Sequence, residues 1–420
     1  MYEFYKGAEF FNFELTRILG AAPSGGCDIA EFLDALAQIK LNDAKSWQQA
    51  WTKQANKVEK LANDALATGQ KTTARDAFLR ASNYFRASQY LTFERETKLR
   101  ILERSIANFE CAIPLLDYLV EPIEVAHEGL KLPGRLYLPN DKQRVSDKTP
   151  VVIVCGGADS TKEELHFITG AAGPPNGYAM VLFDGPGQGI SLLRDQTVQR
   201  PDWEAVTSSV LQYLAAYATA NPDAALDMER VAIMGASMGG YYSLRSASDP
   251  RIKACVAIDA FYDLFDLVTV RQPKLFMSLW LGGWIPDGVI NTLTQLQGRV
   301  DFQSQWEVWC SSTIFGLQAP SDVMRKTKEY TFRLPGGGEL LDTVKYPVLV
   351  SGAAHSLYFK PEVASGKIFE CLGHLEECEK EVWVPEEPAE GGLQAKVGAW
   401  ALMQYRTFKF LDKHFKIRRK

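Results

Sequence analysis

Residues 231–240 constrain the fold of this chain more than any other stretch. An apolar, strand-like run leads into Gly235, Ser237 and Gly239, and a helix-forming segment follows. In a G-x-S-x-G pattern of this kind, a sharp strand-to-helix turn lifts the serine hydroxyl above the sheet. Both glycines are needed because the turn brings neighbouring backbone segments too close for a Cβ atom. The pattern predicts that Ser237 stands in a nucleophile elbow at the end of a central strand.

Apolar runs elsewhere in the chain alternate with helix-forming segments. Most of these runs are continuous, which is typical of strands that are covered on both faces of a sheet. An entry hairpin is expected over residues 123–127 and 134–138, and further strands over 150–155, 178–183, 252–258, 344–351 and 381–384. A helix is expected over residues 203–220. This alternation predicts an α/β fold with a doubly wound, mostly parallel sheet.

The N-terminal part of the chain shows helical periodicity and no strand pattern. Trp47 and Trp51, for example, lie on one face of a predicted helix over residues 46–69. A chain of 420 residues also exceeds what a single hydrophobic core usually serves. We therefore expect a helical cap domain over residues 1–118 and a main domain over residues 119–420.

Residues 266–341 interrupt the strand pattern of the main domain. The segment has no clear strand and is rich in aromatic residues, among them Trp280 and Trp306. Because ligands bind outside the carboxyl ends of the strands in such sheets, we expect a helical lid over that edge. The same apolar content would equally suit a docking surface for the cap domain.

Composition narrows the class of function. The net charge is −5 with both signs spread along the chain, which argues against a nucleic-acid partner. No run approaches the ~20 apolar residues that span a bilayer, and the N-terminus lacks the basic start and apolar core of a signal peptide. We therefore expect a cytoplasmic protein without membrane contact. Seven scattered cysteines predict no disulfide framework and no metal site, and no cofactor motif is present, so we expect no cofactor.

Three motifs together resemble a known family. They are Gly-Gly-Ala-Asp-Ser-Thr-Lys-Glu-Glu at 156–164, Phe-Asp-Gly-Pro-Gly-Gln-Gly at 183–189, and the serine motif at 235–239. Behind a helical N-terminal domain, this order resembles the α/β-hydrolase superfamily. More narrowly, it resembles the branch of bacterial 2,6-dihydroxypseudooxynicotine hydrolases and fungal hydrolases that shorten or cyclise polyketides. The resemblance implies Ser237 as nucleophile, an aspartate after the penultimate strand, a histidine after the last strand, and the possibility of a homodimer.

The two partners of such a serine are missing from their expected positions. A serine hydroxyl is a poor nucleophile until a base takes its proton, and a carboxylate usually orients that base. At the aspartate position the sequence has His355, and the loop that should supply the histidine, residues 385–394, contains none. The other histidines stand at positions 127, 166, 374 and 414. The sequence therefore predicts a degenerate catalytic triad.

Three hypotheses follow, and we favour the first. In it, the fold is kept for an oxyanion hole made by the backbone N–H groups of Met238 and of Gly157 or Ala158. Such donors stabilise an enolate or alkoxide as well as a tetrahedral intermediate. A reactive carbonyl substrate held folded under the lid would then undergo ring closure or C–C bond rearrangement instead of hydrolysis.

The second hypothesis is a rewired serine hydrolase that cleaves an ester or a C–C bond. His355 would act as the base for Ser237, and Glu390, Asp263 or Asp259 would orient its ring. The third hypothesis is a pocket that binds a small molecule without catalysis. It is weakened because a binding pocket needs neither the serine with its glycines nor the oxyanion loop.

The aromatic lid predicts an apolar carbonyl substrate, of the kind found in secondary, polyketide-type metabolism. Candidate substrate-binding residues follow the oxyanion strand, the serine motif and the next strand, or belong to the lid. They are Asp159, Tyr241, Tyr262, Asp263, Trp280 and Trp306. Asp159 would equally serve as a helix cap.

Overall fold

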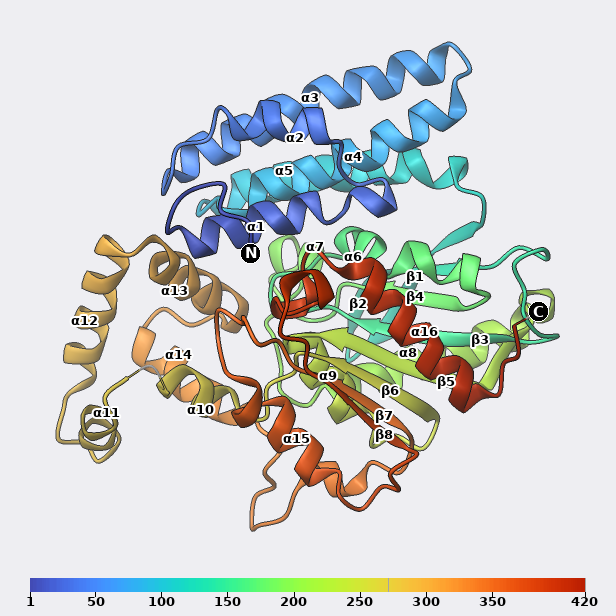
Figure 1. Ribbon diagram of the computed structural model, residues 1–420. Helices are drawn as coiled ribbons and strands as arrows, with labels where there is room; N and C mark the ends of the chain where they lie inside the picture. The colour runs from blue at the N-terminus through green and yellow to red at the C-terminus, as the bar shows by residue number, and fades with distance from the viewer. Residues whose placement is uncertain (271, 420) are drawn as a thin grey trace.

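The computed structural model describes residues 1–270 and 272–419, and its centre is a sheet of eight strands (Figure 1). The strands run in the order β1-β2-β4-β3-β5-β6-β7-β8. β1 and β2 form an antiparallel hairpin, β2 pairs antiparallel with β4, and the remaining pairs are parallel. The bounds are β1 Leu119–His127, β2 Leu130–Leu138, β3 Thr149–Cys155, β4 Ala179–Phe183, β5 Leu226–Ala236, β6 Ile252–Ile258, β7 Val348–Ser351 and β8 Lys380–Trp383. The predicted α/β fold is confirmed.

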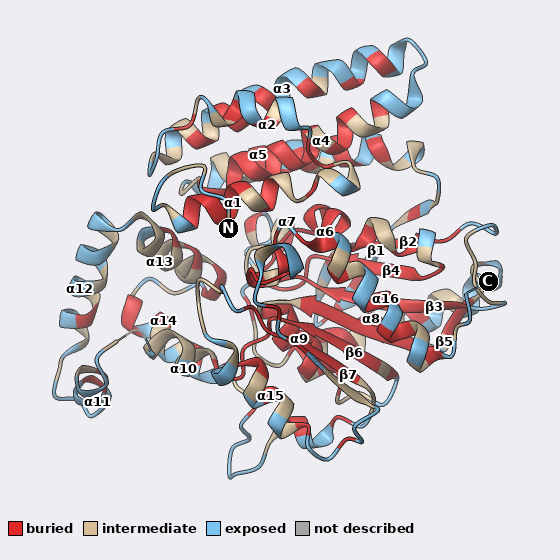
Figure 2. Ribbon diagram, in the orientation of Figure 1, coloured by how far each residue is buried: buried red, intermediate tan, exposed pale blue. Residues whose placement is uncertain are grey.

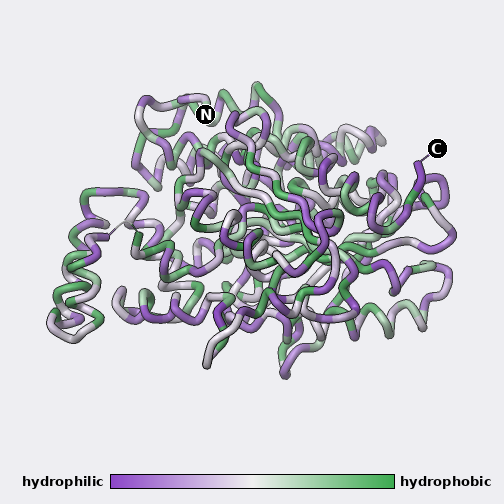
Figure 3. Tube along the Cα trace, turned by 60° about the horizontal axis from the view of Figure 1, so that its bottom comes forward, coloured by the Kyte–Doolittle hydropathy of each residue, from purple (hydrophilic) through white to green (hydrophobic). Residues whose placement is uncertain are grey.

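Burial along the strands explains their sequence patterns. Every residue of β3, β4 and β7 is buried, whereas β1 at the edge of the sheet alternates between exposed and buried positions (Figure 2). Strands covered on both faces need a continuous apolar run, and a strand with one wet face needs only every second residue to be apolar. Seen from another side, hydrophobic residues gather in the central strands and hydrophilic residues lie mainly toward the outside (Figure 3).

Helices cover both faces of the sheet. The step from β3 to β4 runs in one direction along the strand order, and the steps from β4 to β5 and onward run in the other. Right-handed crossovers therefore put α6 on one face and α8, α9 and α15 on the opposite face. α16 lies beside α6, because Gln404 Nε2 donates to the Ile168 carbonyl at 2.8 Å. The helices are α6 Lys162–Ile168, α7 Gly189–Leu193, α8 Trp203–Ala220, α9 Met238–Ser246, α15 Ser365–Cys371 and α16 Trp400–Phe415.

The N-terminal helices stack above one edge of this layered core (Figure 1). They are α1 Glu9–Leu19, α2 Ile29–Leu36, α3 Ala44–Ala67, α4 Lys71–Tyr90 and α5 Arg95–Ala112. Asp43 caps α3, since its Oδ1 accepts hydrogen bonds from the N–H groups of Lys45 at 3.0 Å and Ser46 at 3.1 Å. The chain changes from helices to strands between α5 and β1, next to the predicted boundary at residue 118.

A second helical segment lies between β6 and β7 in the chain. In Figure 1 it is at the left, below the N-terminal helices. Its helices are α10 Leu264–Thr269, α11 Lys274–Leu281, α12 Asp287–Val300, α13 Phe302–Phe315 and α14 Pro320–Lys326. Among the described residues, no helix has both the length and the apolar composition that a membrane span requires. We call this segment the lid, the role that the sequence predicts for residues 266–341 and that stays a prediction.

The strand order reverses direction between β3 and β5, which are neighbours in the sheet. The chain leaves β3 toward one edge of the sheet and leaves β5 toward the other. The loops that follow these two strands therefore run apart and leave a crevice between them. In open α/β sheets the crevice at such a switch point is the usual ligand site. The loop after β3 and the serine turn after β5 therefore meet at this crevice.

Candidate active site

Ser237 sits on a strained turn between β5 and α9. Its backbone has φ 57° and ψ −121°, which a residue other than glycine adopts only where its surroundings enforce it. A Cβ atom on Gly235 would lie 2.3 Å from the carbonyl oxygen of Gly239, and one on Gly239 would lie 2.3 Å from that of Cys155. The Ser237 N–H donates to the Ile258 carbonyl at 2.8 Å. Close backbone packing thus requires both glycines, and the half-buried Ser237 lines a cavity.

Two backbone N–H groups beside Ser237 are free to bind a ligand. Met238 opens α9, and the N–H groups of the first helical turn have no acceptor within their own helix. Among the described residues, nothing accepts a hydrogen bond from the N–H of Met238 or of Ala158. The Gly157 N–H, in contrast, donates to the Ser160 hydroxyl at 3.2 Å. Of the two predicted alternatives after β3, the Ala158 N–H is therefore the free one.

Two buried glutamines hold the loop after β3 in place. Gln188 Nε2 donates to the carbonyls of Gly156 at 2.7 Å and Gly157 at 3.0 Å, and Gln199 Nε2 donates to the Ala158 carbonyl at 3.1 Å. In a trans peptide the C=O and the N–H point in opposite directions. Fixing the Gly157 carbonyl therefore fixes the Ala158 N–H on the other side. Gln188 belongs to the glycine-rich motif at 183–189, so this motif positions the loop after β3.

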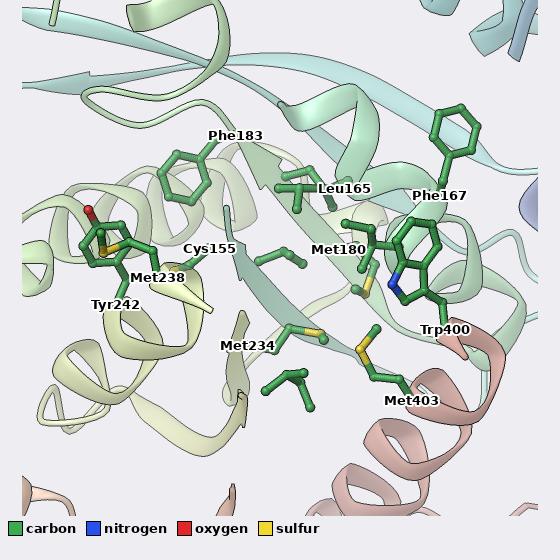
Figure 4. Packing of buried hydrophobic residues seen from close by; sticks show 14 of the residues in the cluster. Cys155, Leu165, Phe167, Met180, Phe183, Met234, Met238, Tyr242, Trp400 and Met403 are labelled. Atoms are coloured by element: carbon green, nitrogen blue, oxygen red, sulfur yellow. The ribbon is translucent and has the colours of Figure 1, made fainter. Parts of the chain in front are cut away.

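The cavity above Ser237 has a volume of about 440 Å³. Its wall combines residues of α1, α4, the ends of β3 and β5, the lid helices and α16. Part of the wall is drawn in Figure 4, where the side chains of Met234 and Met403 point toward one another. Trp306 of α13 also lines the cavity and stacks on Tyr90 of α4, with ring centroids 4.9 Å apart. The wall is thus largely apolar and comes from every part of the fold.

No imidazole lines this cavity, although all five histidines lie in the described part of the chain. His355 is exposed, and its backbone N–H donates to the Gly392 carbonyl at 2.9 Å, beside a bridge to Leu393. Its ring forms no hydrogen bond with any described residue. The backbone pairing fixes His355 at the surface, so the structure does not place it as the base for Ser237. The remaining histidines, which also lie away from the cavity, are His127, His166, His374 and His414.

The loop after β8 presents an amide at the cavity instead. Gln394 is 2% exposed and lines the cavity. Its Oε1 accepts a hydrogen bond from Ser356 Oγ at 2.8 Å, and its Nε2 donates to the Asp259 carbonyl at 3.1 Å. A carboxamide is not basic enough to take a proton from a serine. Gln394 is not among the residues predicted from the sequence, because its only signal is its place shortly before the last helix.

A buried ion pair fixes the same loop to β6. Asp259, with φ 48°, lies 2.8 Å from Lys396 Nζ and accepts a hydrogen bond from Ser351 Oγ at 2.7 Å. Both charged side chains are fully buried. Burial lowers the pKa of Lys396, and the nearby Asp259 carboxylate opposes that shift. Neither residue lines the cavity, so Asp259 is engaged by Lys396 and is not the predicted orienting group for His355. Lys396 is not among the residues predicted from the sequence.

Buried charges also join the N-terminal helices to the cavity wall. Arg17 of α1 donates two hydrogen bonds of 2.6 Å to Glu164 of α6 and one of 2.9 Å to Asp159. Arg86 of α4 lies 3.1 Å from Glu164. Burial alone would raise the pKa of Asp159, but Arg17 holds that pKa below its ordinary value. Asp159 is therefore a paired anion in the cavity wall, and its role as a substrate contact stays a prediction.

The two tyrosines predicted to contact substrate do not line the cavity. Tyr241 is fully buried, and its hydroxyl donates to the Thr331 carbonyl at 3.3 Å. The Tyr262 hydroxyl donates to Glu339. Each hydroxyl is engaged by the segment that connects the lid to β7, and the role of the two tyrosines as substrate contacts stays a prediction.

Asp263 and Trp280 are likewise outside the cavity wall. Asp263 accepts a hydrogen bond from the Asp266 N–H at 2.9 Å and so caps α10. Trp280 is 1% exposed and packs with Met277 and Ile290 in a separate cluster within the lid. The carboxylate of Asp263 is thus engaged as a helix cap and the Trp280 indole is enclosed by lid helices, and their role as substrate contacts stays a prediction.

Comparison with known proteins agrees with this fold. A family model described as esterase FrsA-like matches residues 29–279. The chain belongs to the FrsA-like esterase family. Hydrolyase poxO of Penicillium oxalicum is 45% identical to this FrsA-like chain over 425 residues and covers all of both chains. The α/β hydrolase xenA of Xenoacremonium sinensis is 44% identical over 414 residues, which are 98% of this chain and 97% of its own.

Among solved structures, that of 2,6-dihydroxy-pseudo-oxynicotine hydrolase is similar, with a TM-score of 0.69 and 20% identity over 95% of each chain. At this identity the likeness supports the fold alone. Together with the family match and the relatives named hydrolases, it identifies the FrsA-like chain as an enzyme of the α/β-hydrolase fold. The resemblance inferred from the three sequence motifs is confirmed.

Proposed function

We propose that this enzyme catalyses a non-hydrolytic reaction, ring closure or C–C bond rearrangement, of an apolar carbonyl substrate of polyketide-type secondary metabolism. The observation that carries the proposal is that Gln394, and no imidazole, lines the cavity beside Ser237. Without a base the Ser237 hydroxyl stays protonated and is a poor nucleophile. A water molecule at the same place would lack an imidazole to activate it.

In this proposal the oxyanion hole stabilises the negative charge that develops on the substrate during the reaction. The N–H groups of Met238 and Ala158 would donate to the carbonyl oxygen of the substrate. As negative charge develops on that oxygen, in an enolate or an alkoxide, these preorganised donors stabilise it without having to reorient. The hydrogen bonds from Gln188 and Gln199 to the carbonyls of Gly157 and Ala158 support this role, because they hold the loop after β3 in place.

The shape of the cavity supports the choice of substrate. A volume of about 440 Å³ suits a small molecule of roughly drug size. Aromatic and aliphatic walls would hold a flexible substrate in a folded conformation and bring two of its carbon atoms together. Well-oriented intramolecular reactions gain up to about 7–11 kcal/mol from such proximity. This gain makes ring closure the reaction that the cavity favours.

Hydrolysis is the second candidate, because the family model is described as esterase-like and relatives carry the name hydrolase. It requires a base for Ser237 that the cavity wall does not supply as imidazole. Binding without catalysis has no observation in its favour.

The test uses purified protein and two sets of probes. The first set is a panel of linear diketones and triketones with a phenyl end group, and the second is p-nitrophenyl butyrate. We expect at least one carbonyl probe to close a ring, seen by mass spectrometry as an unchanged mass or the loss of one water. We also expect ester turnover no faster than in Ser237→Ala.

Water labelled with heavy oxygen distinguishes the alternatives. Ester turnover that depends on Ser237 and puts labelled oxygen into the acid product would contradict the proposal and favour hydrolysis. Quenching of tryptophan fluorescence by the carbonyl probes, without any product, would favour a binding protein.

A further inference from the structure

Glu14 brings a carboxyl group to the cavity from outside the hydrolase core. It lies on α1, one turn before Arg17, and it lines the same cavity as Ser237. Its side chain is 2% exposed. The N-terminal helices, which the sequence predicts as a cap, also form part of the cavity wall, through Phe13, Glu14, Arg17 and Tyr90. The cap thus supplies a titratable group to a cavity that no histidine lines.

The Glu14 carboxylate is poorly paired for a buried charge. Its Oε1 receives no hydrogen bond from the described residues, and the nearest cationic atom, Arg17 Nη1, is 3.5 Å away. Arg17 is already engaged by two hydrogen bonds to Glu164 and one to Asp159. Buried polar groups normally find partners, because leaving one unpaired costs about 1–3 kcal/mol or more. A buried carboxylate in a cavity wall with one oxygen that receives no hydrogen bond from the described residues therefore calls for a functional explanation.

The electrostatic surroundings separate Glu14 from its neighbour. Burial raises the pKa of Glu14 to about 7, Arg17 offsets part of that shift, and Asp159 adds to it. Asp159 itself is held below its ordinary pKa by Arg17. Two carboxyl groups whose surroundings push their pKa values apart are typical of acid–base sites. Near neutral pH, Glu14 can both accept and donate a proton.

We propose that Glu14 is a catalytic residue that takes a proton from the carbon next to the substrate carbonyl. This inference rests on the proposed function. The ionised carboxylate accepts the proton, and the electrons of the C–H bond move onto the carbonyl oxygen. The resulting enolate oxygen is held by the N–H groups of Met238 and Ala158. Glu14 thereby supplies the base that the oxyanion hole alone does not provide.

The remaining step returns the proton. The enolate carbon forms a bond to a second carbonyl carbon of the same molecule, and the π electrons of that carbonyl move onto its oxygen. The alkoxide then takes the proton back from the Glu14 carboxyl. The ring-closed product has the mass of the substrate, and subsequent loss of the new hydroxyl with a neighbouring hydrogen releases one water. No oxidant, reductant or second substrate is needed.

Proton exchange tests this step directly. The panel of carbonyl probes is incubated in deuterium oxide with wild type, Glu14→Gln and Glu9→Gln, and deuterium uptake beside the carbonyl is followed by NMR. Glu9 is the matched control, because it lies on the same helix and is exposed. We expect wild type and Glu9→Gln to exchange alike, and Glu14→Gln to exchange about 10²–10⁴-fold more slowly. Circular dichroism checks that the variants are folded.

The pH profile adds a readout that a structural role would not move. Exchange by wild type should rise with pH through about 7 as Glu14 ionises, and the profile of Glu14→Gln should lack this step. Absence of exchange by wild type on every probe, or equal exchange by folded Glu14→Gln, would overturn the inference. Ring closure that does not depend on Glu14 overturns it and leaves the proposed function standing. Proton exchange that depends on Glu14 but is not followed by ring closure supports the role of Glu14 and overturns the proposed function.

Discussion

Among single residues, the ionised form of Glu14 that the proposed proton transfer requires is also the form that destabilises the fold. Its pKa is about 7 in the folded protein against an ordinary value of 4.5, because burial disfavours the ionised form. The folded state therefore prefers protonated Glu14. Its contribution to stability is complete below the ordinary pKa and is lost as the pH rises through about 7. A shift of this size corresponds to about 3 kcal/mol.

We expect Glu14→Gln to unfold at a higher temperature than wild type at about pH 8, because glutamine never ionises. The difference should shrink toward about pH 5, where Glu14 is protonated. Differential scanning calorimetry across this range measures it. The exposed Glu9→Gln provides the control, with no pH-dependent difference. A gain for Glu14→Gln that is the same at every pH would show that ionisation is not its cause.

Ser237 and Glu14 show how far single residues can be predicted from the sequence. Ser237 stands in a motif whose glycines have a steric reason, and the structure shows the same close contacts. Glu14 stands in a run of aromatic and aliphatic residues on α1, where one acidic residue carries no signal. Its helix docks through Arg17 against Asp159 and Glu164, far away in the chain, and no local pattern records such a contact.

Among the structural elements, the loops after β7 and β8 decide what the serine turn can do. Backbone pairing between them puts His355 outside and Gln394 inside. The chemistry of the site thus depends on which residue of a short loop faces the cavity. A histidine placed at 394 instead of 355 would lie where the fold expects a base.

We therefore expect Gln394→His to gain turnover of p-nitrophenyl butyrate. The gain should be at least about tenfold and below the ~10²–10⁴ of a fully oriented base, because no carboxylate is positioned to hold the new ring. Gln394→Leu is the control, and the double variant with Ser237→Ala should lose the gain. If folded Gln394→His shows the turnover of Gln394→Leu, position 394 does not reach the serine.

The elements themselves were largely predictable, and their contacts were not. The apolar runs predict β6 at residues 252–258, and the structure has it at Ile252–Ile258. The periodicity predicts a helix over 203–220, which α8 occupies. Trp280 and Trp306 look alike in sequence, yet one is enclosed within the lid and the other lines the cavity. Only the packing of the lid helices separates them, and that packing leaves no periodic trace.

For the whole molecule, Arg17 couples the N-terminal helices to the core. Arg17→Met would leave Glu164 buried with Arg86 as its remaining partner. Removing one member of a buried ion pair typically costs about 3–5 kcal/mol. We expect a loss of that order in the free energy of unfolding, measured by urea denaturation.

Two further variants test the cause of this loss. Adding Asp159→Asn to Arg17→Met should recover part of it, because Asp159 loses its ion pair when Arg17 is replaced and asparagine carries no charge. Lys57→Met, which breaks the exposed pair with Asp34, should change the free energy of unfolding by less than about 1 kcal/mol. Full additivity of Arg17→Met and Asp159→Asn would contradict the pairing.

The homodimer implied by the resemblance stays a prediction.

The cavity wall draws on both ends of the chain, from Phe13 on α1 to Met403 on α16. Domains fold during synthesis from the N-terminus onward. A growing polypeptide can form its N-terminal helices and most of its sheet long before α16 leaves the ribosome. Until that last helix docks, the reaction chamber lacks one side. A newly made molecule should therefore remain inactive until α16 has been synthesised and has docked.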